Sequence, residues 1–164
     1  IFSELLPSVL IKCHQNGIKF QVFQQCLEEQ QDKIKDIYKR LNFDFKLFSF
    51  SKSPFEYYKN IDFAISRSGA SSLAELINLR IPFITIPLPS SADNHQFENA
   101  LYFEKKGYCF LIEEKFIHDK LFNLLKELNQ NRNKLLLFKK NMGKHSDKDS
   151  LFKIKKIIEK VLNV

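Results

Sequence analysis

The sequence predicts an α/β fold in which a Rossmann-like parallel sheet has helices on both faces. Short apolar segments that fit strands alternate along the chain with segments that fit amphipathic helices. Their spacing fits right-handed βαβ units, which pair successive strands in parallel. The chain has 164 residues, 44% of them apolar and 27% charged, which suits one domain with a buried core.

The expected elements follow one another in a regular order. Residues 2–15 have apolar side chains at helical spacing and end at Asn16-Gly17, a typical helix stop. Residues 18–23 (IKFQVF) alternate as a strand does, and residues 28–41 return to helical spacing. The later elements that we expect are strand 43–50, a short helix opened by Pro54, strand 61–65, helix 72–79, strand 82–86, helix 94–106, strand 108–112 and helices 115–128, 131–142 and 150–162.

A strand is expected before the first helix. Domains of this kind usually begin with a strand, and the turn that follows it often binds phosphate. Here the helix over residues 2–15 comes first. We therefore expect residues 1–164 to form a sheet that lacks its first strand and is incomplete at its centre or at one edge.

The positive charge is concentrated in the C-terminal part of the chain. The formal net charge is +7, and residues 115–164 contain thirteen Lys or Arg against five Asp or Glu, whereas residues 1–114 contain thirteen against fourteen. Two interpretations are open: a lysine-rich helical face in solvent, or a patch that faces anionic lipid headgroups or a phosphate-bearing partner. We do not expect nucleic acid as a partner, because the aromatic residues of this part have helix-core spacing: Phe116, Phe122, Phe138 and Phe152.

Cysteine usage and hydropathy narrow the class of protein further. Cys13, Cys26 and Cys109 are odd in number and far apart, which predicts reduced thiols in a cytosolic protein. Apolar stretches are all too short to cross a membrane, so we expect no membrane-spanning helix.

The first candidate binding segment is SRSGASSLAEL, residues 66–76, between a strand and a helix. Gly69 permits a tight turn, and the hydroxyls and free amides of residues 70–73 could bind phosphate or sugar oxygens. Ser72 and Glu75 also fit a capping box, so from the residues alone Glu75 is either a helix cap or a ligand contact. Arg67 could equally pair with a carboxylate.

The second candidate segment follows the strand PFITIP. The loop LPSSAD leads to Asn94-His95-Gln96 at the expected start of the next helix, with Asp93 or Asn94 as its N-cap. The polar side chains of His95 and Gln96 should lie beside the first segment. The sequence contains neither a metal-binding H-E-x-x-H nor a G-x-S-x-G motif, so we expect neither a metal nor a serine nucleophile.

Together the two segments resemble a known family. SRSGASSLAEL and IPLPSSADNHQFENALYFEKKGY, in this order and at this separation, closely resemble the C-terminal domain of the MurG family of bacterial transferases. This family transfers N-acetylglucosamine from UDP-GlcNAc to lipid I, which makes lipid II in peptidoglycan synthesis. The resemblance is specific over residues 43–112 and implies that residues 1–164 are the C-terminal, donor-binding half of a two-domain GT-B glycosyltransferase.

The resemblance also implies which residues bind the donor. Ser51 would lie beside the uracil. Ala70, Ser71 and Ser72 would lie around the diphosphate and sugar, and Glu75 would hold the ribose hydroxyls. The sugar hydroxyls would be contacted from the start of the second helix. The complete set is Ser51, Ser68, Gly69, Ala70, Ser71, Ser72, Glu75, His95, Gln96 and Asn99.

Other parts of the family site lie outside these residues. The family's Gly-rich loop and its N-terminal domain, which supplies the general base, the lipid I site and the membrane contact, are absent from this sequence. The resemblance therefore implies an inverting, cofactor-free transfer on the cytoplasmic face of the inner membrane, with no catalytic residue in this chain. We expect the chain to be inactive by itself.

Three other functions fit parts of this pattern. The soluble subunit of a dolichol-linked N-acetylglucosaminyltransferase would explain the missing domain, but its turn is usually less like SRSGA. A non-hydrolysing UDP-N-acetylglucosamine 2-epimerase shares the fold but needs acidic and histidine residues that we do not find. A non-catalytic nucleotide-sugar-binding module is the alternative from another class.

Overall fold

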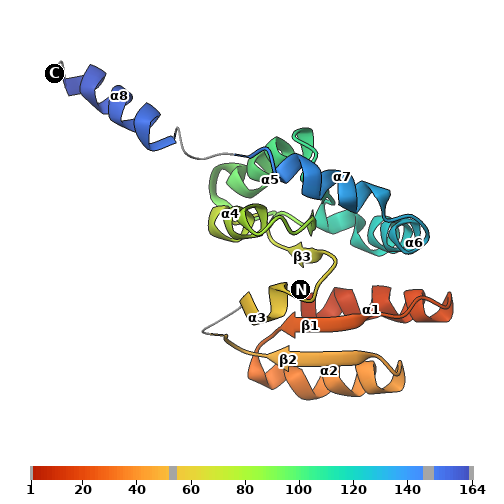
Figure 1. Cartoon of the computed structure of the whole chain (residues 1–164). Helices are drawn as coiled ribbons and strands as arrows, with labels where there is room; N and C mark the ends of the chain where they lie inside the picture. The colour runs from red at the N-terminus through yellow and green to blue at the C-terminus, as the bar shows by residue number, and fades with distance from the viewer. Residues whose placement is uncertain (1, 52–54, 146–149, 163–164) are drawn as a thin grey trace.

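Figure 1 shows the computed structural model of the chain, in which helices and strands alternate. The structure describes residues 2–51, 55–145 and 150–162. The strands are β1 (Gln21–Gln25), β2 (Asp44–Phe48), β3 (Ala64–Ser66), β4 (Phe83–Thr85) and β5 (Cys109–Leu111). The α-helices are α1 (Phe2–Gln15), α2 (Glu28–Arg40), α3 (Phe55–Tyr58), α4 (Ala70–Asn78), α5 (His95–Lys105), α6 (Phe122–Gln130), α7 (Asn133–Met142) and α8 (Ser150–Leu162).

The strand pairs are parallel, as expected. β1 pairs with β2. β4 lies between β3 and β5, so that Ala64, Phe83 and Cys109 are side by side. The described strands form two sheets, of order β1-β2 and β3-β4-β5, with no pairing between β1 and β3. The α/β class is therefore confirmed, and the sheet is divided between β1 and β3.

Helices cover both faces of the sheet, as the alternation along β4 shows. Phe83 packs in one core cluster with Leu73 and Leu76 of α4. Its neighbour Ile84 belongs to a second cluster, to which α1, α2 and α6 contribute. Successive side chains of a strand point to opposite faces, so one cluster lies on each face. Both side chains are completely buried, and burial of a residue of this size contributes about 1.5–3 kcal/mol.

Strand bounds differ from the expectation in the first half of the chain, with β2 at 44–48 instead of 43–50 and β3 at 64–66 instead of 61–65. β1 begins at Gln21 rather than at residue 18, because its partner strand β2 begins only at Asp44. The alternating residues before Gln21 include the buried Ile18 but precede the ladder. The end of β1 correspondingly lies two residues later than expected, at Gln25.

The expected helices 72–79 and 115–128 also begin differently. α4 starts at Ala70, because Gly69 has the extended backbone of an N-cap, with φ −64° and ψ 136°. The first half of the expected helix 115–128 forms two short helical turns instead, Glu114–Phe116 and Ile117–Leu121. The regular helix α6 begins only after them. Pro54, the expected start of α3, lies outside the described residues.

The basic C-terminal part is amphipathic. α8 extends away from the body of the molecule (Figure 1). Its apolar side chains are exposed: Ile154, Ile157, Ile158, Val161 and Leu162. The helix is therefore more than a lysine-rich face in solvent.

The aromatic residues that the sequence assigned to a helical core are only partly buried there. Phe122 and Phe138 are buried, whereas Phe116 is 38% exposed. The side chain of Phe152 lies outside the described part.

The three cysteines are free, as their number and spacing predicted, and the structure shows that all three are buried. Burial raises the pKa of the Cys13 thiol to about 11, although the charge of Lys12 acts in the opposite direction. Burial, and secondarily the charge of Glu104, also raises the pKa of Cys109. In the part of the chain that the structure describes, no helix is long and apolar enough to cross a membrane.

Slow thiol chemistry is the measurable consequence. Because all three thiols are buried and a raised pKa keeps Cys13 and Cys109 protonated at pH 8, we expect them to react with Ellman's reagent about 100-fold more slowly in the native protein than in the unfolded chain. Absorbance at 412 nm in buffer and in guanidinium chloride measures both rates. Rapid reaction of any thiol in protein with a native circular-dichroism spectrum would contradict this burial.

Candidate functional site

The candidate site lies where β3 and β4 end and α4 and α5 begin. Ser66 and Thr85 are paired at the last position of these parallel strands, so the two following loops leave the sheet side by side. Helix N-termini at this edge present free amides and the positive end of the helix dipole. Nine of the ten predicted binding residues lie on these two loops and helices. The structure therefore brings the two sequence segments together.

Gln96 joins the two loops. Its side-chain carbonyl oxygen accepts hydrogen bonds from the backbone N–H groups of Ser68, at 3.3 Å, and Leu88, at 3.0 Å. One turn later on α5, the amide of Asn99 donates to the backbone oxygen of Ser68 at 3.2 Å. These bonds make α5 the support of the β3–α4 turn. The oxygen of Gln96 is thus used within the protein, whereas no described hydrogen bond uses its amide N–H groups.

Ser68 is a structural part of the turn. The residue is fully buried, and its hydroxyl lies 2.8 Å from the hydroxyl of Thr85. Its side chain is therefore turned into the protein, and it holds the turn against β4. Of the predicted binding residues in this turn, Ala70, Ser71 and Ser72 are exposed and Gly69 is partly exposed.

The first turn of α4 is an uncapped helix start. The first intrahelical bond runs from the N–H of Leu73 to the oxygen of Gly69 at 3.0 Å, and no side chain caps the helix. The amides of Ala70, Ser71 and Ser72 precede this bond and have no acceptor among the described hydrogen bonds. Three unpaired amides at the positive end of a helix, with two exposed serine hydroxyls, suit an anion such as phosphate.

Glu75 is not a helix cap. Because α4 begins at Ala70, Glu75 lies in the second turn, and the expected capping box with Ser72 is absent. The carboxylate is exposed and accepts a hydrogen bond from the hydroxyl of Tyr58 at 3.2 Å. The pKa of Tyr58 is raised by burial first, and then by the charge and hydrogen bond of Glu75. The capping-box interpretation was therefore wrong, and Glu75 is available at the surface.

The start of α5 has an unusual backbone. Asp93 and Asn94 both have left-handed φ angles, 46° and 54°. Asn94 is the N-cap, as expected, but its side chain makes no capping bond. The exposed ring of His95 donates from Nδ1 to the oxygen of Ala92 at 2.8 Å. This bond fixes the tautomer so that Nε2 faces outward as an acceptor.

Arg67 is a structural bridge, as the interpretation of it as a carboxylate partner predicted. Its guanidinium lies 2.6 Å from Glu114 and donates to the backbone oxygens of Ile86 and Pro87 at 3.1 and 3.0 Å. Both members of the ion pair are about one-fifth exposed. Arg67 therefore connects the first loop to the second and to the end of β5.

Ser51 lies in the other part of the divided sheet. It follows β2, whereas the other predicted residues follow β3 and β4. Sequence reasoning also missed Tyr58, which carries no local signal because its contact with Glu75 depends on the tertiary fold. Within the described residues, no three His, Cys, Asp or Glu side chains are grouped as metal ligands.

Comparisons with known proteins agree with this arrangement. Residues 1–161 match the glycosyltransferase family 28 C-terminal domain. Over 143 residues the chain is 37% identical to the UDP-N-acetylglucosamine--N-acetylmuramyl-(pentapeptide) pyrophosphoryl-undecaprenol N-acetylglucosamine transferase of Pelagibacter ubique, which covers 87% of this chain and 40% of that protein. The protein of the same description from Rickettsia bellii is 39% identical over 152 residues, covering 87% of this chain and 43% of its own length.

A solved structure has the same fold. The crystal structure of Acinetobacter baumannii MurG superposes with a TM-score of 0.79 at 22% identity, covering 97% of this chain and 46% of that one. The chain thus spans less than half the length of these proteins.

The two bonds accepted by Gln96 predict a loss of stability when its oxygen is removed. Gln96→Met keeps the length of the side chain but leaves two backbone N–H groups without an acceptor, so we expect the free energy of unfolding to fall by about 1–3 kcal/mol. Urea titration followed by circular dichroism measures the change. The control is Glu98→Gln on the exposed side of α5, expected within about 0.5 kcal/mol of the unmodified chain. Equal stability of the two variants would refute the bridging role of Gln96.

Proposed function

Because the chain belongs to the family of the glycosyltransferase family 28 C-terminal domain, we propose that it is the donor-binding part of a UDP-GlcNAc-dependent glycosyltransferase. The proposed acceptor is the one that the names of its relatives give, N-acetylmuramyl-(pentapeptide) pyrophosphoryl-undecaprenol, or lipid I. The observation that carries the proposal is the uncapped start of α4, held beside α5 by Gln96. There, free amides and neutral polar side chains suit a nucleotide diphosphate joined to a sugar.

The diphosphate fits the start of α4. The amides of Ala70, Ser71 and Ser72 offer donors that need no proton transfer, and the helix dipole favours the charge. Gly69 and Ser68 shape the turn that presents them. In an inverting displacement, negative charge grows on the departing UDP, so donors already in place stabilise the transition state more than the ground state.

The ribose and the sugar fit the flanking side chains. The carboxylate of Glu75 lies one turn after Ser72 on the exposed side of α4 and can accept bonds from vicinal hydroxyls. His95 offers its Nε2 acceptor, Gln96 offers its amide N–H groups, and Asn99 offers its side-chain oxygen, since its amide nitrogen already donates to Ser68. Ser51 is the proposed contact of the uracil from the end of β2.

The acceptor determines where the protein would work. Lipid I is anchored in a membrane by its undecaprenyl chain, so the transferase would meet it as a peripheral protein on the cytoplasmic face of the inner membrane. We propose that the general base and the acceptor site are supplied by the part of the transferase outside these residues, since the relatives are more than twice as long as their matched segments.

The ribose assignment predicts a specific loss of affinity. Glu75→Gln keeps the shape of the side chain and removes its charge, so we expect the affinities for UDP-GlcNAc, UDP-GalNAc and UMP all to fall by about 10- to 100-fold, as for a lost hydrogen bond to a charged group. Isothermal titration calorimetry measures the three dissociation constants.

Two comparisons make this titration decisive. Asp36→Asn removes an exposed carboxylate from α2 and should leave all three affinities unchanged. Preference for UDP-GlcNAc over UDP-GalNAc in the unmodified chain would support a donor-sugar site, whereas equal binding of all three would indicate a generic uridine nucleotide site. Unchanged affinity in Glu75→Gln would remove the ribose contact.

Donor binding and catalysis should be separable. We expect the 164-residue chain to form no detectable lipid II from lipid I and radiolabelled UDP-GlcNAc, because the proposed general base lies elsewhere. Thin-layer chromatography of the lipid product measures this, with the full-length Rickettsia bellii relative as the positive control. Turnover by the isolated chain would show that the site is complete without a second domain.

A further inference from the structure

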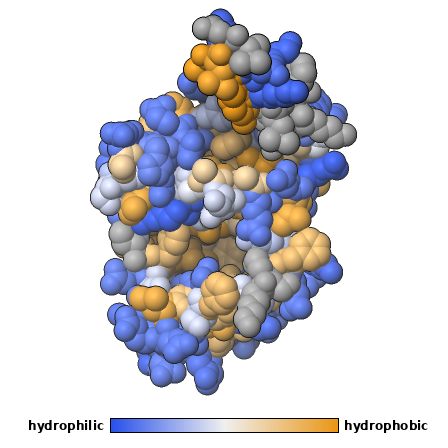
Figure 2. Space-filling model, turned by 90° about the vertical axis from the view of Figure 1, so that its left-hand side faces the viewer, coloured by the Kyte–Doolittle hydropathy of each residue, from blue (hydrophilic) through white to orange (hydrophobic). Residues whose placement is uncertain are grey.

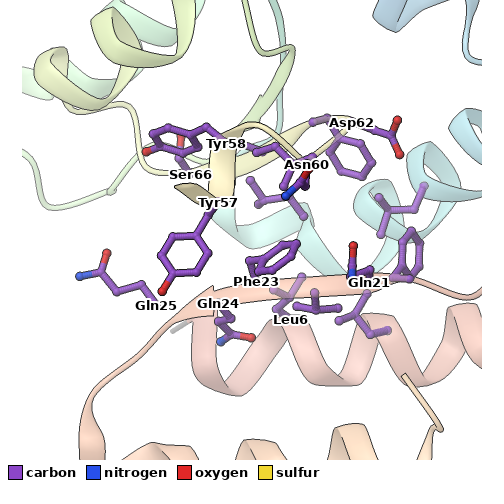
Figure 3. A pocket seen from close by; sticks show the side chains of 18 of the residues that line it. Leu6, Gln21, Phe23, Gln24, Gln25, Tyr57, Tyr58, Asn60, Asp62 and Ser66 are labelled. Atoms are coloured by element: carbon purple, nitrogen blue, oxygen red, sulfur yellow. The ribbon is translucent and has the colours of Figure 1, made fainter. Parts of the chain in front are cut away.

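Two consecutive tyrosines at the end of α3 face the two parts of the divided sheet. A hollow lies between these parts (Figure 2), and both rings border it (Figure 3). The ring of Tyr57 lies toward β1 and β2, where it stacks on Phe48 with centroids 4.5 Å apart and contacts Phe23 at 5.7 Å. The ring of Tyr58 lies on the β3 side and packs against the core cluster beneath α4. Tyr58 therefore belongs to the part of the sheet that carries the candidate site.

The hydroxyl of Tyr58 holds one oxygen of the Glu75 carboxylate. It donates to Oε2 at 3.2 Å, which is longer than the usual distance of about 2.7–2.8 Å, so the bond directs the carboxylate without neutralising it. Within the described residues, no hydrogen bond or ion pair uses Oε1. A carboxylate can accept about four hydrogen bonds, so roughly three places remain. That number is enough for a pair of vicinal hydroxyls.

The ring of Tyr58 is a firm support for an exposed side chain. Glu75 is exposed, and an exposed Glu populates several rotamers, so fixing it around a ligand costs conformational entropy. Tyr58 is half-buried, with its ring packed on the core, and has already lost most of its own freedom. Its bond restricts the carboxylate before a ligand arrives, and such preorganisation raises affinity.

The bond also closes the chain around the first binding segment. Tyr58 precedes β3 and Glu75 lies in the second turn of α4, so the 17 positions between them include β3 and the whole β3–α4 turn. The carboxylate is thus fixed relative to the free amides at the start of α4. In a nucleotide the covalent structure sets the distance from ribose to phosphate, so both contacts need this fixed spacing.

The direction of the bond suits hydroxyl ligands. Burial first, and then the charge and the hydrogen bond of Glu75, raise the pKa of Tyr58, so the phenol stays protonated at neutral pH. An ionised carboxylate only accepts hydrogen bonds, so Tyr58 is the donor and Oε1 remains an acceptor. Ribose hydroxyls supply the matching donors.

We propose that Tyr58 is a positioning residue of the donor site, which holds the carboxylate of Glu75 in the orientation that receives the two ribose hydroxyls. Tyr58 acts through Glu75 and thereby favours ribonucleotides over nucleotides that lack these hydroxyls. The proposal rests on the assignment of Glu75 to the ribose in the proposed function.

The first test measures affinity by isothermal titration calorimetry. Tyr58→Phe removes only the hydroxyl, so we expect the dissociation constant of UMP to rise by about 3- to 10-fold. The probe 2′,3′-dideoxy-UMP lacks both hydroxyls and should bind equally to the unmodified chain and to Tyr58→Phe. Glu75→Ala removes the acceptor, so adding Tyr58→Phe to it should change UMP affinity by less than about 2-fold.

The second test needs no ligand. NMR relaxation of the Glu75 methylene carbons reports side-chain mobility, which should increase in Tyr58→Phe. The matched control is Tyr57→Phe, because no described hydrogen bond uses the hydroxyl of Tyr57. The control should change neither the mobility of Glu75 nor the affinity for UMP. The melting temperatures of both variants should lie within about 2 °C of the unmodified chain.

The outcomes separate this proposal from the proposed function. Equal weakening of UMP and 2′,3′-dideoxy-UMP by Tyr58→Phe would show that Tyr58 supports the site only by packing, which overturns the proposal. Unchanged mobility of Glu75 in Tyr58→Phe would overturn it as well. In both cases the loss of UMP affinity in Glu75→Ala would still support the ribose contact. Unchanged UMP affinity in Glu75→Ala would instead remove the ribose contact, and the positioning role with it.

Discussion

The pairing of β3 with β4 is the constraint on which the candidate site depends. It brings Ser66 and Thr85 to the same level, so the two loops that follow begin side by side. Only at this separation can one oxygen of Gln96 reach the backbone of both loops. Arg67 adds a second connection through the oxygens of Ile86 and Pro87. Rigid strands thus position the loops, and side chains on α5 fix their final geometry.

The candidate binding groups divide into those that shape the site and those that face outward. Ser68 and the oxygen of Gln96 are engaged within the protein, so their contribution is to hold the turn. The amides at the start of α4, Glu75 and Nε2 of His95 face outward. Such a division is what electrostatic preorganisation requires, because donors held by the fold need no rearrangement when charge develops on a ligand.

The sequence was most informative where a pattern is long or its chemistry is local. α1 and α2 have helical periodicity over many residues, and their bounds match the expectation closely. The bounds of short strands were predicted less accurately. Those of β1 depend on where β2 pairs with it, and the local sequence of β1 does not contain this information. The start of α4 was misplaced because Ser72 and Glu75 have capping-box spacing, yet Gly69 adopts the extended N-cap conformation.

The contacts within the site were the least predictable. Polar residues at the two loops were identifiable from composition, because strand ends followed by helix starts collect binding groups. Their partners were not, since Gln96 contacts Ser68 across 28 positions and Arg67 reaches Glu114 from another element. A side chain that binds backbone in a distant loop leaves no periodicity in the sequence. Its role can be seen only when the strands have placed the loops.

The proposed donor site draws on both parts of the divided sheet. The proposed uracil contact, Ser51, follows β2, whereas the proposed diphosphate and sugar contacts follow β3 and β4. A single nucleotide sugar that touches both must span the two sheets, so its affinity depends on their separation.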